Sequence, residues 1–276
     1  MRRGRPLPNI MVAPNGARRT KADHPALPIS IEETLEVALA CQVAGADGLH
    51  LHIRDENGGH SLDTGLYREA IAAITAASPD LFVQATSEAA GRYSARDQRD
   101  MIRDLAPASV SIALREMIRT AEDQSEASAL YAWCADNDVA VQHIAYTPKE
   151  LDWLIDCFDN DIIPGDVHQI QLVLGSYSSI EPPAPTLIGA YKARLSAASQ
   201  RYDLDWMVCA FGPSETRCLA EAAGAGGKVR VGFENSLWNT DGTLAADNAD
   251  RVSRVKAAIA SATRTAAAQT VSPSDR

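Results

Sequence analysis

The sequence contains no long apolar segment. No apolar run approaches the roughly 20 residues that a bilayer-spanning helix needs. The N-terminal stretch MRRGRPLPNIMVAPNG has the basic residues of a signal peptide, but its apolar part before Pro14 is too short for the hydrophobic region of one. Positive charge is also scarce: the formal net charge of -10 argues against nucleic acid or membrane partners, which bind broad positive surfaces. We therefore expect a cytoplasmic protein with neither kind of partner.

Paired cysteines are absent as well. The five cysteines are odd in number, widely scattered and without a C-x-x-C pair. This argues against a disulfide framework and against a thiolate zinc site. The residues are Cys41, Cys134, Cys157, Cys209 and Cys218. We expect them to be reduced and mostly buried.

What the chain does contain is an alternation of short β-branched runs and helical stretches. The composition, 46% hydrophobic and 22% charged, is that of a globular enzyme rather than a disordered or fibrous protein. Helical candidates have clear boundaries, such as the segment after Ser30, which has a capping box with Glu33 and ends at Gly45. Periodicity predicts eight strands, at residues 9–14, 47–53, 81–87, 109–114, 139–146, 169–175, 206–212 and 228–235.

The order of these elements predicts a single α/β domain. Eight βα units without an internal linker favour a (β/α)8 TIM barrel over a doubly wound sheet. We assign residues 9–262 to the barrel, residues 1–8 to a flexible N-terminus and residues 263–276 to a polar C-terminal tail. Active sites of such barrels lie at the C-terminal ends of the strands. The candidate residues are therefore those at the strand ends.

Two histidines stand one residue apart in the stretch LHLHIRDENG. Residues two apart on a strand point to the same side, so His50 and His52 can share one cation. A bare His-x-His can also be one hydrogen-bonded core residue beside one rim residue. A metal site requires a further ligand.

The last predicted strand, KVRVGFEN, supplies a third ligand. Arg230 and Glu234 share a face there, and in a closed barrel this strand and the one with the histidines both flank the first strand. His50, His52 and Glu234 can then converge as two imidazoles and one carboxylate, which suits catalytic zinc and also ferrous iron or manganese. The alternative for Glu234 is a helix cap or an ion pair with Arg230.

Other strand ends are also polar. The loop PNGARRTKADHP carries Asn15, Arg18, Arg19, Lys21 and His24, and it is either an anion site or a solvated basic loop. Thr86, Ser87 and Glu88 follow the third strand, Glu116 follows the fourth, and His143 lies in the fifth. Each of these could bind substrate, or could cap a helix or pack in the barrel.

In combination, these segments resemble the β-keto acid cleavage enzyme family. The similarity rests on PNGARRTKADHPALPIS, AGADGLHLHIRDENG, VQATSE, QLVLGSY and GGKVRVGFENS, in this order between residues 14 and 236. The resemblance implies a zinc-dependent barrel that converts a β-keto acid and acetyl-CoA to acetoacetate and a new acyl-CoA. It implies zinc ligands at His50, His52 and Glu234, a mechanistic arginine at Arg230 and a substrate-binding hydroxyl at Thr86. It further implies a role in amino acid catabolism and a homo-oligomer, specifically a tetramer.

Two departures from the family pattern affect this expectation. Asn235 stands where aminohexanoate-type members have an aspartate that removes the substrate proton, and an amide cannot act as a base at neutral pH. Glu116 or Glu88 would have to replace it. Arg18 stands where those members hold a substrate ammonium with an acid, and His143 replaces a second acid. We therefore expect a neutral or anionic substrate tail, bound by residues among Asn15, Arg18, Thr86, Ser87, His143 and Asn235.

Two other functions remain open from the sequence. The same metal site could serve a class II aldolase or a retro-Claisen hydrolase that uses no CoA. Asn235 also leaves room for a barrel that binds a small carboxylate and has lost catalysis.

Overall fold

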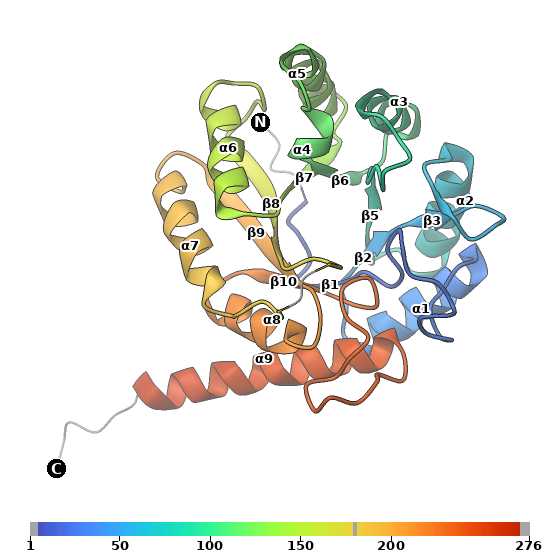
Figure 1. The fold of residues 1–276 in the computed structure, drawn as a ribbon, viewed down its shortest axis with the longest axis vertical. Coiled ribbons are helices and arrows are strands. Elements are labelled where there is room, and N and C mark those ends of the chain that lie inside the picture. The colour runs from blue at the N-terminus through green and yellow to red at the C-terminus, as the bar shows by residue number, and fades with distance from the viewer. Residues whose placement is uncertain (1–4, 179–180, 271–276) are drawn as a thin grey trace.

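The chain folds into a closed barrel of eight parallel strands surrounded by helices (Figure 1). The structure is a computed structural model that describes residues 5–178 and 181–270. Around the barrel the strands follow the order β1-β10-β9-β8-β7-β6-β5-β2, so β2 and β10 both flank β1. The fold class expected from the sequence is confirmed. The barrel strands are β1 (Ile10–Val12), β2 (Gly48–Leu51), β5 (Phe82–Thr86), β6 (Ser109–Ala113), β7 (Ala140–Ala145), β8 (Val167–Leu174), β9 (Asp203–Ala210) and β10 (Lys228–Val231).

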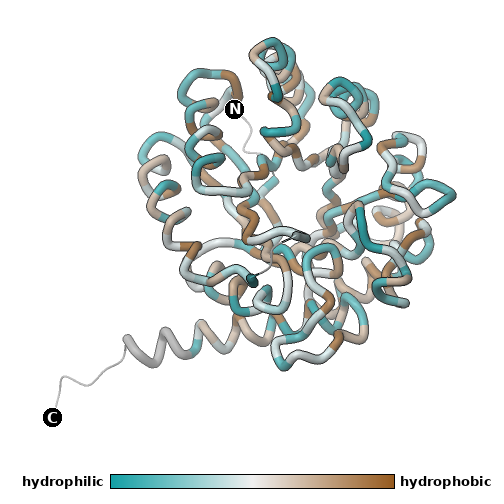
Figure 2. Tube along the Cα trace, viewed as in Figure 1, coloured by the Kyte–Doolittle hydropathy of each residue, from teal (hydrophilic) through white to brown (hydrophobic). Residues whose placement is uncertain are grey.

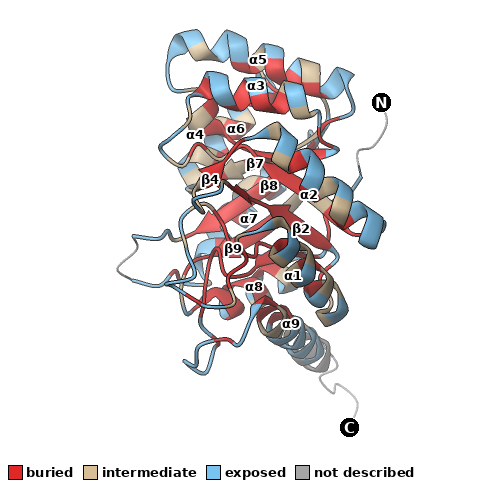
Figure 3. Ribbon diagram, turned by 90° about the vertical axis from the view of Figure 1, so that its right-hand side faces the viewer, coloured by how far each residue is buried: buried red, intermediate tan, exposed pale blue. Residues whose placement is uncertain are grey.

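Helices connect the strands and cover the outside of the barrel. The first helix begins with the capping box of Ser30 and Glu33 and ends at Gly45, whose φ of 114° suits glycine. Figure 3 shows the strands mostly buried, although β8 and β9 begin with exposed residues, and the helices buried mainly on their inner faces. The helices are α1 (Ile31–Ala44), α2 (Thr64–Ala77), α3 (Ala95–Leu105), α4 (Leu114–Met117), α5 (Ala121–Asp136), α6 (Pro148–Asp159), α7 (Leu187–Ala198), α8 (Glu215–Gly224) and α9 (Asn248–Thr270).

Apolar side chains fill the space between the strands and the outer helices. In Figure 2 the outer helices alternate between hydrophilic and hydrophobic positions, as expected for helices with one face on a core. The five cysteines are buried and free, which agrees with the expectation from the sequence. No helix in the described part of the chain is long and apolar enough to cross a membrane.

The segment before β1 closes the N-terminal end of the barrel. Leu7 is buried with Met11, Phe82 and Met207, and its backbone N–H donates to Asp205 Oδ2 at 2.8 Å. These contacts hold residues 5–8 in place, unlike the flexible N-terminus expected from the sequence. Residues 1–4 of that segment lie outside the described residues.

Two further features differ from the expectation. A short antiparallel pair, β3 (Ile53–Arg54) and β4 (His60–Ser61), follows β2 and adds a hairpin above the barrel. Helix α9 continues to Thr270, so the boundary expected after residue 262 falls inside this helix. The alanine-rich sequence there has high helix propensity, although it is polar overall.

Candidate active site

A cavity of about 280 Å³ opens at the C-terminal ends of the barrel strands. Its lining includes charged residues and apolar ones. The lining includes His50 from β2, Arg230 from β10 and Glu234 from the segment after β10. This is the end of the barrel at which active sites of the fold lie.

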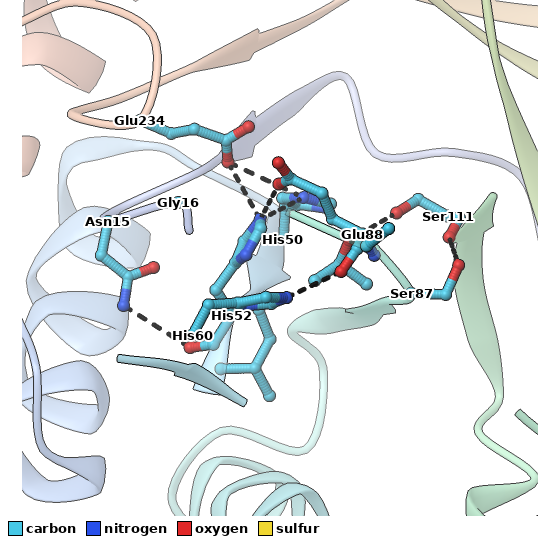
Figure 4. A network of polar contacts seen from close by, with 12 residues as sticks. Asn15, Gly16, His50, His52, His60, Ser87, Glu88, Ser111 and Glu234 are labelled. Carbon is cyan, nitrogen blue, oxygen red and sulfur yellow. Dashed lines mark hydrogen bonds and ion pairs between the residues drawn. The ribbon is translucent and has the colours of Figure 1, made fainter. Parts of the chain in front are cut away.

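His50, His52 and Glu234 converge beside this cavity. His50 Nε2 lies 3.1 Å from His52 Nε2. Glu234 Oε2 lies 3.7 Å from His50 Nε2 and 3.4 Å from His52 Nε2. Figure 4 shows the three side chains pointing toward one another. These are the three residues that the sequence places together.

A turn rather than the strand itself positions Glu234. Strand β10 ends at Val231, and Gly232 has a φ of 144°. A Cβ at Gly232 would lie 2.3 Å from the backbone oxygen of Ala13, so a larger residue would push the two strands apart. The backbone N–H of Glu234 donates to the same Ala13 oxygen at 3.1 Å. Close packing of the turn on β1 therefore brings the carboxylate over the histidines.

Arg230 lies beside the carboxylate and is buried. Its Nη2 donates to Glu234 Oε1 at 2.8 Å and contacts Cys209 Sγ and Asn235 Oδ1, each at 3.4 Å. Burial raises the pKa of the Glu234 carboxyl, but Arg230 and the two histidines more than offset this and hold the pKa well below its usual range. The group is therefore ionised, with one oxygen on Arg230 and the other facing the imidazoles.

The three side chains form a donor set that fits a divalent cation. Their candidate ligand atoms lie within 4.8 Å of one another, and all three residues are buried. Among the described residues, Glu234 Oε2 has no hydrogen-bond partner. Burial and the charge of Arg230 lower the pKa of His50 to about 3, so this imidazole is neutral near pH 7 and can offer a lone pair. Two imidazoles and one carboxylate match the ligands of a catalytic zinc.

Four more of the expected residues line the cavity: Arg18, Thr86, Glu88 and Glu116. Thr86 Oγ1 accepts from Ser111 Oγ at 3.2 Å, and Glu116 Oε2 accepts from the backbone of Ala89 at 2.9 Å. Burial raises the pKa of Glu88, whose Oε2 lies 3.9 Å from His52 Nε2. Two carboxylates thus stand in the same cavity as the three converging residues.

The structure places His143 outside the cavity, against the expectation that it binds substrate. On β7, Ile144 lines the cavity, so the preceding residue points the other way, toward the helices. There His143 packs against the rings of Tyr131, Phe158 and His168. Burial lowers the pKa of His143 to about 3. It is a core residue and cannot set substrate charge.

Three other expected substrate-binding residues do not line the cavity either. Asn15 Nδ2 donates to the backbone oxygens of Pro28 and His52, at 3.1 and 3.5 Å, and so anchors the loop after β1. Ser87 Oγ donates to the Ser111 carbonyl at 3.0 Å. Asn235 is fully buried behind Arg230. These contacts with protein groups account for part of the polarity at the strand ends, whereas Asn15 Oδ1 and Asn235 Nδ2 have no hydrogen-bond partner among the described residues.

One side of the cavity consists of residues that were not expected from the sequence. Val173 and Phe211, from the ends of β8 and β9, join Ile144 in an apolar wall. Tyr177 lies in the loop after β8, and Arg115 stacks on the ring of Tyr146 with its Cζ 3.4 Å from the ring centroid. Aromatic residues at strand ends and the arginine after β6 were the only sequence signals for this side of the cavity. Because similar residues occur throughout the chain, these signals did not single out the cavity lining.

The chain is similar to several known proteins over most of its length. The chain is 26% identical over 252 residues to the 3-keto-5-aminohexanoate cleavage enzyme of Fusobacterium nucleatum subsp. nucleatum, covering 89% of each chain. It is 26% identical over 260 residues to the 3-oxoadipate:acetyl-CoA acetyltransferase of Cupriavidus necator, covering 90% of this chain and 87% of that one. A solved ternary complex of ObcA with a C4-CoA adduct and oxalate has a TM-score of 0.68 at 16% identity, covering 86% of this chain and 64% of that one, and supports the fold alone. The model of the beta-keto acid cleavage enzyme family matches residues 9–271, so the chain belongs to this family.

Proposed function

We propose that the protein is a zinc-dependent enzyme that converts a β-keto acid and acetyl-CoA to acetoacetate and a new acyl-CoA. The observation that carries this proposal is the buried group of His50, His52 and Glu234 beside Arg230, in a chain of this family. The relative from Cupriavidus necator is named for an acetyl-CoA-dependent reaction on a keto acid, which supports acetyl-CoA as the co-substrate.

His50, His52 and Glu234 would hold the zinc ion. Bound there, zinc would supply a Lewis acid that polarises the substrate oxygens and makes the C2 proton easier to remove. Arg230 is a permanent cation beside these ligands, because its guanidinium remains protonated. It is placed to stabilise negative charge that develops on the enolate. Thr86 offers a hydroxyl in the same cavity for orienting the substrate.

The C2 proton needs a base, and Asn235 cannot supply one. Two carboxylates line the cavity, Glu88 and Glu116, and we propose that one of them accepts this proton. The enolate carbon then attacks the acetyl carbonyl of acetyl-CoA and expels the CoA thiolate as the thioester C–S bond breaks. The thiolate adds to the keto carbon, and the C2–C3 bond breaks while C2 takes back the proton from the carboxyl group that accepted it. The acyl group leaves on CoA, and C2 with its carboxylate leaves joined to the acetyl group as acetoacetate.

Arg18 determines the expected charge of the substrate tail. It lines the cavity and adds positive charge at the mouth. A cation there disfavours an ammonium and favours a neutral or carboxylate-bearing tail, such as that of 3-oxoadipate. The apolar wall of Ile144, Val173 and Phe211 is compatible with an uncharged tail as well.

The reaction is tested by incubating zinc-loaded protein with a panel of β-keto acids and acetyl-CoA and measuring acetoacetate and acyl-CoA. We expect both products in equal amounts, and no turnover by the His50→Ala, His52→Ala double variant. His60→Ala is the matched control, because His60 is buried beside His52 but is not one of the three proposed ligands. Cleavage that does not depend on acetyl-CoA would favour the aldolase or hydrolase. Zinc and ligand binding without turnover would favour a barrel that has lost catalysis.

The substrate charge is tested by comparing kcat/KM for keto acids with carboxylate, uncharged and amine tails. A charge-assisted pair with Arg18 contributes about 1.5 to 3 kcal/mol, or roughly ten- to hundred-fold in specificity. We expect Arg18→Glu to reverse the ranking of the carboxylate and amine tails. A parent enzyme that prefers the amine, or an unchanged ranking in the variant, would show that Arg18 does not contact the tail.

A further inference from the structure

A line of buried amides runs from His50 across the interior of the barrel. His50 Nδ1 lies 2.8 Å from Gln84 Oε1. Gln84 Nε2 donates to Gln142 Oε1 at 3.0 Å, and Gln142 Nε2 lies 3.8 Å from Met207 Sδ. Gln84, Gln142 and Met207 come from β5, β7 and β9, which alternate around the barrel and so contribute to one layer of its interior.

The sulfur at the end of this line fixes the direction of every hydrogen bond in it. A thioether can accept a hydrogen bond but cannot donate one. Gln142 must therefore turn its NH2 group to Met207 and its oxygen to Gln84. Gln84 then donates to Gln142 and has only its oxygen left for His50. Ser109 Oγ, 3.4 Å from Gln84 Nε2, can accept from the same NH2 group and is compatible with this direction.

These hydrogen-bond directions fix the tautomer of the His50 ring. An oxygen acceptor at Nδ1 requires the ring proton to be there, which leaves the lone pair of a neutral ring on Nε2. Nε2 is the atom that faces His52 and Glu234. His52 differs, because its Nδ1 has no partner among the described residues. The two glutamines therefore fix the tautomer of His50 but not that of His52.

We infer that Gln84 is a positioning residue that, with Gln142 and Met207 behind it, holds His50 with its proton on Nδ1 and so presents Nε2 to a divalent cation. The inference rests on the metal site of the proposed function. The sequence carries no carboxylate at position 84, so a neutral amide takes the orienting part that a carboxylate, a backbone carbonyl or a water plays beside most metal-binding histidines.

The test uses 15N-histidine NMR of the metal-free protein and zinc affinity measured by competition with a chelator. Gln84→Met replaces the amide by a side chain of similar length that cannot offer the oxygen to His50. Gln171→Met is the matched control, because Gln171 is equally buried inside the barrel but donates to the backbone oxygens of Leu172 and Met207 instead. Gln142→Met and Met207→Leu leave the contact between His50 and Gln84 in place. They remove only the hydrogen bonds that orient the Gln84 amide.

In the parent we expect the His50 resonances of a neutral ring with hydrogen on Nδ1. Gln84→Met should show a mixture of tautomers and bind zinc about 10- to 100-fold more weakly, whereas Gln171→Met should match the parent. Gln142→Met and Met207→Leu should show a smaller shift in the same direction, and they provide the test if Gln84→Met does not fold. A parent His50 with hydrogen on Nε2 would overturn the inference. So would an unchanged tautomer and zinc affinity in Gln84→Met, Gln142→Met and Met207→Leu. Failure of the proposed reaction alone would leave both readouts intact and so is distinguishable.

Discussion

At the scale of single residues, two buried arginines each pair with a buried glutamate but have different expected functions. Arg230 pairs with Glu234 at the cavity. Arg251 pairs with Glu215 away from it, and also donates to Asn239 Oδ1 at 2.9 Å. Burial raises the pKa of Glu215 to about 7, so this carboxyl depends on Arg251 to remain ionised. The comparison thus sets an arginine that we propose to act in catalysis beside one that we expect to be structural.

We predict that Arg230→Met and Arg251→Met fail in different ways. Loss of a charge that stabilises the transition state should lower kcat by about 100- to 1000-fold in Arg230→Met. Arg251→Met leaves a buried carboxyl without its partner and should lower the free energy of unfolding by about 3 to 5 kcal/mol, with a smaller change in kcat. Steady-state kinetics and chemical denaturation of both zinc-loaded variants measure this. Parallel losses of activity and stability in the two variants would contradict the distinction.

The residues of the site were predictable from the sequence to different degrees. His50 and His52 follow from the alternation of side chains along a strand. Glu234 was placed by the same reasoning, but the structure reaches it through a turn at Gly232. Its position depends on how closely that turn packs on β1, which periodicity does not report. The polarity of Asn15, Ser87 and Asn235 suggested substrate contacts, but these side chains do not line the cavity and contact other protein groups.

At the scale of elements, the eight strands were predictable because each is a short apolar run between helices with clear caps. The direction of single side chains on a strand was harder to predict. On β7, both Gln142 and His143 are polar, so the sequence does not show which of the two faces the interior. The residues of β3 and β4 are too few to give a periodic signal. The loop after β8 gives no periodic signal either.

The position of His143 makes this part of the barrel sensitive to acid. The rings of His143 and His168 lie 6.2 Å apart, and Tyr131 and Phe158 pack against His143. Burial lowers the pKa of His143 to about 3 and that of His168 to about 4, below the ordinary value of 6.5. Between the lowered and the ordinary pKa the unfolded chain binds a proton that the folded one does not. The contribution of the two neutral histidines to the free energy of unfolding is therefore fully present above about pH 6.5 and is lost as the pH falls toward the lowered pKa values.

We predict that His143→Leu reduces this acid sensitivity. Each such histidine should lower the free energy of unfolding by about 1.4 kcal/mol per pH unit below about pH 6.5. Urea denaturation at several pH values between about 7 and 4.5 should give a shallower slope for the variant, with similar stability near pH 7. The measurement should be made on metal-free protein, because zinc adds its own pH dependence through its ligands. Identical slopes for parent and variant would mean that His143 is protonated in the folded protein.

At the scale of the whole molecule, the net charge of the chain is negative, whereas the cavity is lined by arginines as well as by the carboxylates of Glu88, Glu116 and Glu234. The formal net charge is -10, yet Arg18 and Arg115 line the cavity. Arg19 lies near Arg18, since the guanidinium carbons of both are within 6 Å of the Tyr177 ring centroid. Coenzyme A carries several phosphates and would be repelled by most of this surface. Local positive charge at the mouth would guide it to the site.

We predict that the KM for acetyl-CoA rises with ionic strength and that Arg115 contributes to this effect. Exposed charges are screened over about 8 to 10 Å at ionic strengths near 0.1 M, so added salt weakens such guidance. Arg115→Ala should raise the KM for acetyl-CoA about two- to five-fold at low salt, the effect of one exposed contact, and flatten the salt dependence. Arg194→Ala is the control, because Arg194 has similar exposure and pairs with Asp152, as Arg115 pairs with Glu150, but lies outside the cavity. If both variants respond to salt as the parent does, Arg115 does not meet the phosphates and CoA approaches along another side of the mouth.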